Sequence, residues 1–370
     1  MKVFIVFGTR PEAVKMCPLI LEMKKHAEIE CVICLTGQHK EMLNQVMDAF
    51  NVKSDYNLNV MKNRQSLTTI TTSILSKIEE ILYKEKPDIV LVHGDTTTSF
   101  ASALAAFYQK IPVGHVEAGL RTGDIYSPFP EEMNRILIDR ISTVYFAPTQ
   151  ENKDNLLNEG IKGNIFVTGN TVIDAFTSTV KNKYIYHEQR LNEIDFFNRK
   201  IILVTAHRRE NLGEPLGNIC NAIKQLAKEH KEIIFIYPVH LNPEVREKVY
   251  SILRDVKNVI LTEPLDVLDM HNLMAHCFIV MTDSGGIQEE APHFGKPVLV
   301  LRTETERPEA VKAGTVKVVG VEKNNIIKEA EDLISNSNSY EHMAKSINPY
   351  GDGHASERIV GILKRLYEHK

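Results

Sequence analysis

Short apolar runs alternate with longer segments of helical periodicity along almost the whole chain. In the first half, the runs that predict strands cover residues 2–7, 30–35, 89–93, 113–117, 144–147 and 165–168. In the second half, they cover residues 201–205, 233–237, 259–261, 278–281, 298–301 and 316–319. Strands that alternate with helices in this way form parallel sheets with helices on both faces. The pattern therefore predicts an α/β fold built from doubly wound sheets.

A polar and poorly periodic stretch at residues 181–199 interrupts this alternation, and the pattern restarts after it. The length of 370 residues also exceeds the size at which a single core usually stops growing. We expect two Rossmann-like domains, at residues 1–175 and 176–353, with a final helix at about 354–370 packed back on the first domain. If the two domains face each other across a cleft, the carboxyl ends of their strands would line that cleft. Ligands of doubly wound sheets bind at these strand ends.

Composition and charge exclude several classes of binding partner. The net charge of −4 shows no basic excess of the kind that nucleic-acid binders carry, so we expect no nucleic-acid partner. Neither a signal peptide nor a stretch of membrane-spanning length is present, so we expect no membrane partner. Five cysteines without disulfide spacing favour a cytoplasmic protein, and Cys31 and Cys34 are expected to be buried strand thiols. No ligand motif implies a metal, and we expect no cofactor.

The segment at residues 282–290 carries the most chemical information. It places Ser284, Gly285 and Gly286 where an apolar strand gives way to a helix, so that backbone N–H groups can donate to phosphate oxygens. The helix dipole adds attraction for negative charge. Glu289 and Glu290 follow inside the helix and suit hydroxyl groups, as a nucleotide requires. The alternative is an ordinary glycine-bearing turn followed by an acidic cluster.

Polar residues also follow several of the other predicted strands. Arg10 and Lys15 follow the first strand, where the alternative is a capped helix with two surface cations. Asp95 follows the strand at 89–93, but Asp95 or a neighbouring threonine could simply cap the next helix. Glu117 ends the strand at 113–117, and its alternative is a salt bridge to Arg121.

Two further segments complete the set. Glu131 and Glu132 begin a helix, where they could serve only to complement its dipole. His207 follows the first strand of the second domain, and its alternative is a solvated turn histidine. Together the strand ends supply four groups for proton transfer and a set of cations, including Arg307, for phosphates. The sequence has no nicotinamide-binding fingerprint, which argues against hydride transfer as a way to invert a sugar carbon. An elimination mechanism is the alternative that remains.

Nine motifs in order resemble the non-hydrolysing UDP-N-acetylglucosamine 2-epimerases over nearly the whole chain. They are FGTRPEAVKM at 7–16, HGDTTT at 93–98, GHVEAGLRTGD at 114–124, PEEMNR at 130–135, TGNTVIDA at 168–175, AHRREN at 206–211, YPVHLNP at 237–243, TDSGGIQEEAP at 282–292 and TERPEA at 305–310. The resemblance implies a GT-B-like fold, an interdomain active site and a homodimer. It also implies reversible conversion of UDP-GlcNAc into UDP-ManNAc, which would supply ManNAc for cell-envelope polysaccharide.

The resemblance further implies a mechanism and residue roles. UDP leaves by anti elimination as the carbon-2 proton is removed, 2-acetamidoglucal forms, and UDP adds back with a proton delivered to the other face. The implied catalytic residues are Asp95, Glu117, Glu131 and His207. The residues implied to bind the UDP-sugar are Arg10, Lys15, Asp95, Glu117, His207, Ser284, Gly285, Gly286, Glu290 and Arg307. The residues implied to bind UDP-GlcNAc as an allosteric activator are Gln38, His39, Arg64, Arg208 and His240.

Three other functions fit parts of this pattern. A GT-B glycosyltransferase that uses a UDP-sugar donor would share the fold and the ribose-binding glutamate, but it needs an acceptor groove. A hydrolysing epimerase would release free ManNAc. A non-catalytic nucleotide-sugar sensor would bind UDP-GlcNAc and be stabilised by it without forming product.

Overall fold

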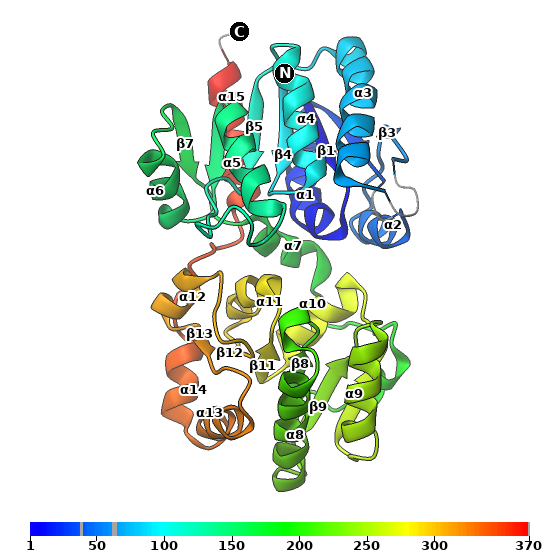
Figure 1. Cartoon of the computed structure of the whole chain (residues 1–370), viewed down its shortest axis with the longest axis vertical. Coiled ribbons are helices and arrows are strands. Elements are labelled where there is room, and N and C mark those ends of the chain that lie inside the picture. Colours follow the sequence, from blue (N-terminus) through cyan, green and yellow to red (C-terminus); the bar gives the residue numbers. More distant parts are fainter. Residues whose placement is uncertain (38–39, 61–64, 369–370) are drawn as a thin grey trace. The chain divides into compact units, whose positions relative to one another are not determined.

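The computed structural model describes residues 1–37, 40–60 and 65–368, and the chain divides into two compact units (Figure 1). Unit 1 comprises Met1–Ser178 and Tyr350–Lys370, and unit 2 comprises Thr179–Pro349. Both units contain a parallel sheet with interleaved helices, which confirms the predicted α/β class. All the predicted strands are present, with ends that differ from the predictions by at most one residue.

The sheet of unit 1 is entirely parallel and has the order β3-β2-β1-β4-β5-β6-β7. Its strands are β1 (Lys2–Phe7), β2 (Glu30–Leu35), β3 (Tyr56–Asn57), β4 (Ile89–His93), β5 (Val113–Val116), β6 (Val144–Ala147) and β7 (Asn164–Val167). β3, which pairs with Cys34 and Leu35, was not predicted, because two residues give no periodicity. The strand order reverses between β1 and β4, which is where doubly wound sheets bind ligands.

Helices cover both faces of this sheet. They are α1 (Arg10–Met23), α2 (Lys40–Ala49), α3 (Leu67–Glu85), α4 (Thr97–Tyr108), α5 (Glu131–Ile141), α6 (Gln150–Asn158), α7 (Thr171–Thr179) and α15 (Ala355–Tyr367). α4 packs between α3 and α5, and its alanines Ala101 and Ala105 are buried in the core below them. Small side chains on α4 allow this close approach, as Figure 1 shows for α3 and α4.

The C-terminal helix α15 belongs to unit 1 and packs against α1. The Asp174 carboxylate on α7 accepts hydrogen bonds from the backbone N–H groups of Ala355 (3.2 Å) and Ser356 (2.6 Å), at the start of α15. A carboxylate at a helix N-terminus satisfies N–H groups that the helix itself leaves without partners. Burial nevertheless raises the pKa of Asp174, against the effect of these hydrogen bonds.

The sheet of unit 2 is also parallel and has the order β10-β9-β8-β11-β12-β13. Its strands are β8 (Ile201–Thr205), β9 (Ile234–Pro238), β10 (Val259–Thr262), β11 (Ile279–Thr282), β12 (Val298–Val300) and β13 (Val316–Val318). The order of the central strands repeats that of unit 1, with its reversal between β8 and β11. The second sheet therefore offers its own ligand position at the carboxyl ends of these two strands.

The helices of unit 2 include three short 3₁₀ segments. They are η1 (Gln189–Glu193), η2 (Arg209–Asn211), α8 (Glu214–Glu229), α9 (Pro243–Leu253), α10 (Val267–His276), α11 (Gly285–Glu290), η3 (Ala291–Phe294), α12 (Pro308–Ala313), α13 (Lys323–Ser335) and α14 (Ser337–Ala344). α8 packs against α9 and α13 over one large apolar core. Residues 181–199 lie in unit 2, where Tyr184 Oη donates to Asp269 Oδ1 on α10 (2.8 Å).

None of the helices in the described part of the chain is long and apolar enough to cross a membrane.

Candidate active site

The turn after β1 is fixed by a buried carboxylate. Glu12 Oε2 accepts hydrogen bonds from the backbone N–H groups of Gly8 (2.9 Å) and Thr9 (2.7 Å), in a capping box that begins α1. Its Oε1 accepts from Thr96 Oγ1 (2.6 Å) in the turn after β4, so one side chain joins the two turns at the strand-order reversal. Burial raises the pKa of Glu12, and these hydrogen bonds oppose that effect. A Cβ at Gly8 would lie 2.0 Å from Thr36 Oγ1, so only glycine fits there.

Glu117 is the most strongly held of the predicted carboxylates. Its Oε2 forms an ion pair with Lys15 Nζ from α1, which is more than a hundred residues away in sequence. Asn170 Nδ2 donates to the same oxygen (3.2 Å), and His93 Nε2 lies 3.6 Å from it. Glu117 also has a backbone φ of 71°, a left-handed conformation that costs a non-glycine residue about 1–3 kcal/mol. Strained residues of this kind cluster at functional sites.

The alternative salt bridge between Glu117 and Arg121 is wrong. Arg121 instead pairs with Glu159 (2.6 Å) and with the buried Asp139 (2.7 Å). Asp139 Oδ1 also lies 2.6 Å from His115 Nδ1, and the other ring nitrogen lies 2.8 Å from the carbonyl oxygen of Gly94. Burial alone would raise the pKa of Asp139, but His115 and Arg121 lower it on balance. This charged network supports the turn that precedes Asp95.

Asp95 does not cap the helix that follows it, because Thr96 is the N-cap of α4. The Asp95 carboxylate pairs with Arg135 Nη2 of α5 (2.5 Å), and the Asp95 carbonyl accepts a hydrogen bond from Asn134 Nδ2 (2.9 Å). About a quarter of the Asp95 side chain remains exposed. A partly exposed carboxylate held by an arginine can meet a ligand while its orientation stays fixed.

Two adjacent glutamates at the start of α5 have different roles. Glu132 is buried and accepts hydrogen bonds from the backbone N–H groups of Thr122 (3.0 Å) and Gly123 (3.1 Å), and it pairs with Arg135 (2.8 Å). Glu131 is half-buried, and its carboxylate has no hydrogen-bond or ion-pair partner within residues 1–37, 40–60 and 65–368. Dipole complementation therefore does not account for both glutamates, and Glu131 retains its carboxylate for other contacts.

His93 was not predicted as a site residue. It ends β4, is 4% exposed, and neither of its ring nitrogens has a hydrogen-bond partner in the described part of the chain. Burial lowers the pKa of His93 to about 3, although Glu117 acts in the opposite direction. Buried polar groups without hydrogen-bond partners are rare in native proteins, which makes His93 a candidate for a functional role. Its place in the HGD sequence at a strand end was the available signal.

In unit 2, the buried Asp283 organises the loop after β8. Its Oδ2 accepts hydrogen bonds from the backbone N–H groups of His207 (2.8 Å) and Arg208 (2.8 Å) and from Asn211 Nδ2 (2.9 Å). Asp283 directly follows β11, so it joins the loops at the reversal point of the second sheet. It was not predicted, because only the tertiary structure brings its backbone partners to it.

The ring of His207 stacks on that of His240, with centroids 4.8 Å apart and an angle of 17° between the planes. His240 Nδ1 accepts a hydrogen bond from the Asn242 backbone N–H (3.1 Å), so its proton lies on Nε2. Loss of surrounding water lowers the pKa of His207, although the residue has an exposed surface. His240 and Arg208 lower it further, against Asp283. A histidine predicted for catalysis therefore contacts one predicted for allostery.

The predicted anion cradle is flanked by arginines. A Cβ placed on Gly285 would lie 3.7 Å from Arg208 Nη2 and 3.8 Å from Arg307 Nη2, so both guanidinium groups border the first turn of α11. Arg307 is held by an ion pair between its Nε and the buried Glu289. Two cations beside the N-terminus of a helix suit a diphosphate.

Glu290 lies on the same short helix as the glycines. Its Oε1 is 3.3 Å from the position of a Cβ on Gly286, and its Oε2 lies 3.7 Å from His271 Nε2. Ser284 is the N-cap of α11, and its backbone N–H donates to Thr282 Oγ1 (2.9 Å). The predicted allosteric residues Gln38, His39 and Arg64 lie outside the described residues.

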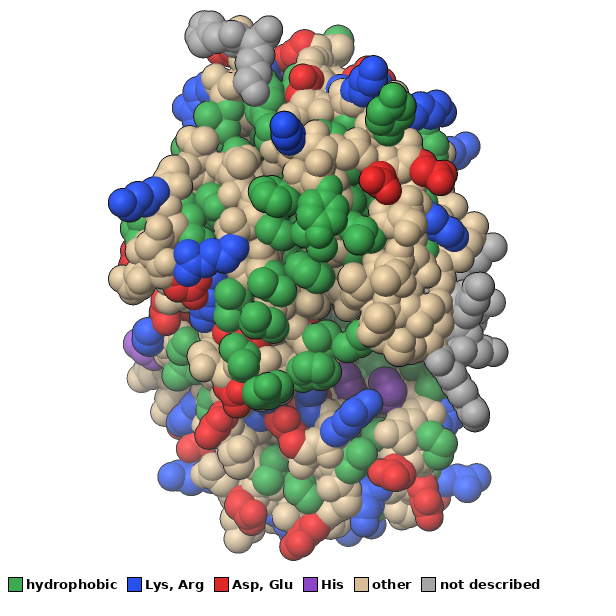
Figure 2. Space-filling model, turned by 45° about the horizontal axis from the view of Figure 1, so that its top comes forward, with side chains coloured by type: hydrophobic (Ala, Val, Ile, Leu, Met, Phe, Trp, Pro, Cys, Tyr) green, Lys and Arg blue, Asp and Glu red, His purple; other side chains and the backbone are tan. Residues whose placement is uncertain are grey.

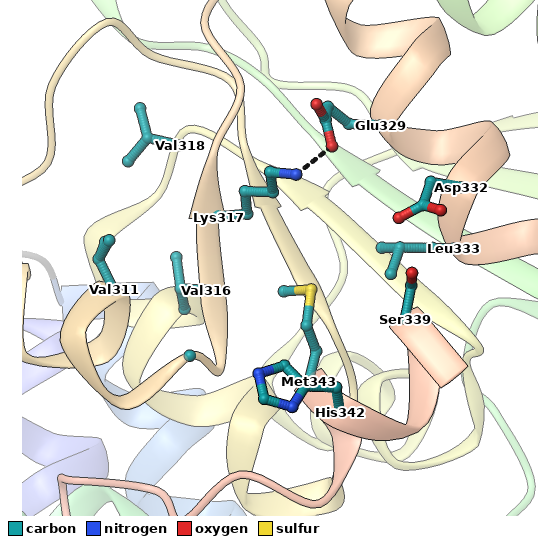
Figure 3. A pocket seen from close by; sticks show the side chains of 11 residues that line it. Val311, Val316, Lys317, Val318, Glu329, Asp332, Leu333, Ser339, His342 and Met343 are labelled. Carbon is teal, nitrogen blue, oxygen red and sulfur yellow. Dashed lines mark hydrogen bonds and ion pairs between the residues drawn. The ribbon is translucent and has the colours of Figure 1, made fainter. Parts of the chain in front are cut away.

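Two other features of unit 2 are separate from these residues. His187, Asp266 and Asp269 could together hold a metal ion, but hydrogen bonds to α10 and to residues 184–188 already occupy the two carboxylates. A cavity of about 440 Å³ lies beside β13, α13 and α14, between apolar side chains such as Val316 and Met343 and the Lys317–Glu329 ion pair (Figure 3). None of the predicted substrate residues lines this cavity.

The fold and these residues define an α/β enzyme with two Rossmann-like units, the GT-B-like class. The family model for UDP-N-acetylglucosamine 2-epimerase matches residues 21–364. The UDP-N-acetylglucosamine 2-epimerase of Bacillus subtilis (strain 168) is 54% identical over 100% of this chain and 97% of its own length. The chain therefore belongs to the UDP-N-acetylglucosamine 2-epimerase family.

Solved structures agree with this assignment. The UDP-GlcNAc 2-epimerase from Neisseria meningitidis, bound to UDP-GlcNAc, is 54% identical with a TM-score of 0.91, over 99% of this chain and 100% of that chain. The enzyme from Methanocaldococcus jannaschii, in complex with UDP-GlcNAc and UDP, is 36% identical with a TM-score of 0.80, over 99% of this chain and 100% of that chain.

The buried His93 predicts a pH dependence of stability. Its pKa is lower in the folded protein than in the unfolded chain, so its contribution is complete above about pH 6.5 and is lost as the pH falls toward 3. Between pH 7 and pH 5 we expect this loss to reach about 2 kcal/mol in the free energy of unfolding. His93→Gln should remove it, whereas the matched control His342→Gln, at an exposed position, should not. Urea unfolding followed by circular dichroism measures both, and equal pH dependence in the two variants would contradict the assignment.

Proposed function

We propose that this protein interconverts UDP-GlcNAc and UDP-ManNAc by epimerisation at carbon 2. The observation that carries the proposal is the set of carboxylates at adjacent strand ends of unit 1, with Glu117 held by Lys15. Asp95 and Glu131 add two further carboxylates from the same edge of the sheet and from α5. Family membership over nearly the whole chain supports the substrate class.

The chemistry requires a leaving group as well as a base. A hydrogen on a sugar carbon that has no carbonyl beside it is too weakly acidic to be removed unless a neighbouring bond breaks with it. One carboxylate takes the carbon-2 proton, the bond from carbon 1 to the phosphate oxygen breaks, and UDP and 2-acetamidoglucal form. A proton is then delivered to the opposite face of carbon 2, and UDP adds back at carbon 1. Two carboxylates, one for each face, suffice for these steps.

We assign Glu117, Asp95 and Glu131 as the groups for proton transfer. Contact with an ammonium group favours the ionised form of a carboxylate, which suits a base. The ion pair to Glu117 also favours a role for Lys15 in holding this carboxylate over direct contact with UDP. Arg10, at the start of α1, would then be the cation of this segment that meets the diphosphate.

Unit 2 is proposed to bind the UDP moiety. Arg307 and the turn at Ser284, Gly285 and Gly286 would hold the diphosphate and stabilise its charge as it leaves. Glu290 would accept hydrogen bonds from ribose hydroxyls. His207, whose pKa is lowered, is neutral at physiological pH and can donate a hydrogen bond to the departing UDP.

We also propose that UDP-GlcNAc activates the enzyme allosterically. The support is the stack of His240 on His207, because a ligand that contacts His240 or Arg208 would reach a proposed catalytic ring directly. Gln38, His39 and Arg64 are included in this proposal from the sequence alone.

A homodimer is proposed from the surface of unit 1. Exposed aromatic side chains lie on the neighbouring helices α3 and α4, with Tyr83 74%, Phe107 56% and Tyr108 63% exposed. Figure 2 shows hydrophobic side chains gathered on one face of this unit. Large exposed apolar patches mark interaction sites, and a second copy of the chain offers the same patch in a twofold dimer. A monomer in sedimentation velocity at micromolar concentration would contradict this proposal.

We place the enzyme in the cytoplasm, because its five cysteines are unpaired thiols, as in a reducing compartment. Recovery of the protein outside the cytoplasm in cell fractionation would contradict this. Its product would then enter the synthesis of cell-envelope polysaccharide.

Turnover in deuterated water tests the function. With UDP-GlcNAc as substrate, NMR should detect UDP-ManNAc that carries deuterium at carbon 2, because the returning proton comes from solvent. Asp95→Asn should lower this rate by at least about a hundredfold, as loss of a proton-transfer group does. Asp48→Asn, which changes an exposed residue of α2, is the matched control and should leave the rate unchanged.

The other outcomes of this experiment identify the alternatives. Product without deuterium would contradict the elimination mechanism, and free ManNAc would indicate a hydrolysing epimerase. Thermal stabilisation by UDP-GlcNAc without product would indicate a sensor or a transferase. In the same assay UDP-ManNAc alone should react slowly, and UDP-GlcNAc should raise its rate by about tenfold. Full rate without added UDP-GlcNAc would contradict allosteric activation.

A further inference from the structure

A second cavity of unit 2, of about 610 Å³, lies between α8, α9 and the loops that precede β8, β9 and β10. Five of its lining residues are cations: Arg199, Lys224, Lys228, Lys231 and Lys257. Asp255 is the acidic residue among those that line it. This concentration of positive charge occurs in a chain whose net charge is −4. The overall charge of the protein therefore does not explain the positive charge of this cavity.

Asp255 shares the cavity with the five cations, but it forms no ion pair with any of them among the described residues. None of them makes a side-chain hydrogen bond or an ion pair within the part of the chain that the structure describes. Two nearby acids are engaged elsewhere, since Glu232 pairs with His230 (3.2 Å) and Glu229 accepts from Gln225 Nε2 (3.0 Å).

The spacing of the lysines adds to the mutual repulsion. Lys224 and Lys228 are four residues apart on α8 and line the same cavity, and like charges at this spacing destabilise a helix. Lys228 lies in the last turn of α8 and Lys231 follows the C-cap residue His230, where cations complement the helix dipole. The dipole effect falls off within the last turn, so it does not extend to Lys224, which lies one turn earlier on α8. A bound anion would relieve the repulsion among all five.

We propose that this cavity binds a small ligand that carries several phosphate charges. Lysine ammonium groups are point charges that suit phosphate, and Arg199 can donate two parallel hydrogen bonds to one phosphate group. The partly buried Ile252 and Val256 supply an apolar floor for the rest of the ligand. The volume falls in the range of small-molecule sites, about 300–1,000 Å³, which favours a compact ligand over a polymer or a membrane.

This site is distinct from the one proposed for UDP. Arg199, Lys231 and Lys257 precede β8, β9 and β10, so they lie at the amino edge of the parallel sheet. His207 and Ser284 follow β8 and β11 at the carboxyl edge. A strand of five residues, such as β8, separates the two edges by roughly 17 Å. A compact ligand bound in this cavity therefore does not reach the site proposed for UDP.

Isothermal titration of the wild-type protein with inorganic tripolyphosphate tests the proposal. Excess UDP is included to occupy the site proposed for it. Lys224→Gln/Lys228→Gln should weaken binding by about tenfold through the loss of two charge pairs. The matched control is Lys323→Gln/Lys328→Gln, which makes the same change in net charge on α13 and should bind like wild type. Lys257→Gln is a second variant in case the α8 variant does not fold, and it should weaken binding by a smaller factor.

Sedimentation with vesicles of equal parts phosphatidylcholine and phosphatidylglycerol separates a free phosphorylated ligand from a lipid headgroup. We expect tripolyphosphate binding that depends on the cavity lysines and no vesicle binding beyond that of the control variant. Equal affinity of wild type, cavity variants and control would overturn the proposal. Vesicle binding lost in the cavity variants, with tripolyphosphate binding unchanged, would overturn the ligand class. Both results are independent of whether the protein epimerises a nucleotide sugar.

Discussion

The ion pair between Lys15 and Glu117 is the interaction on which the proposed chemistry of unit 1 depends. Both side chains are about nine-tenths buried, so removing one partner would leave the other charge in a poorly solvated place. Removing one member of a buried ion pair lowers the free energy of unfolding by about 3–5 kcal/mol, far more than a surface ion pair contributes. The pair also offsets the left-handed backbone of Glu117. Glu12 adds a second constraint, because it joins the turns that present Arg10 and Asp95.

In unit 1 a lysine holds a carboxylate in place, and in unit 2 the charges are reversed. There buried carboxylates hold cations and backbone donors in place, as Asp283 does for the loop after β8 and Glu289 does for Arg307. Each carboxylate fixes groups that would otherwise be mobile, so the donors are oriented before a ligand arrives. Preorganised donors stabilise developing charge more strongly than donors that must move into place. The contact between His207 and His240 extends this constraint to the proposed allosteric residues.

The sequence predicted the strands well because each is a short apolar run, and it predicted site residues by their position at strand ends. It could not predict which side chains meet. Arg121 follows Glu117 by only four residues, yet it pairs with Glu159 and Asp139, while the true partner of Glu117 is 102 residues away. The sequence allowed either Asp95 or a neighbouring threonine to cap the next helix, and only the structure assigns the cap to Thr96. Such pairings depend on the register of distant elements, which local patterns do not contain.

If Lys15 acts through Glu117, a double-mutant cycle shows this most directly. The quantity to measure is kcat/KM for UDP-GlcNAc epimerisation by wild type, Lys15→Met, Glu117→Gln and the double variant. If the two residues act as one unit, the double variant should be no slower than Glu117→Gln, within about threefold. Losses that multiply, so that the double variant shows the product of the two single effects, would contradict the account.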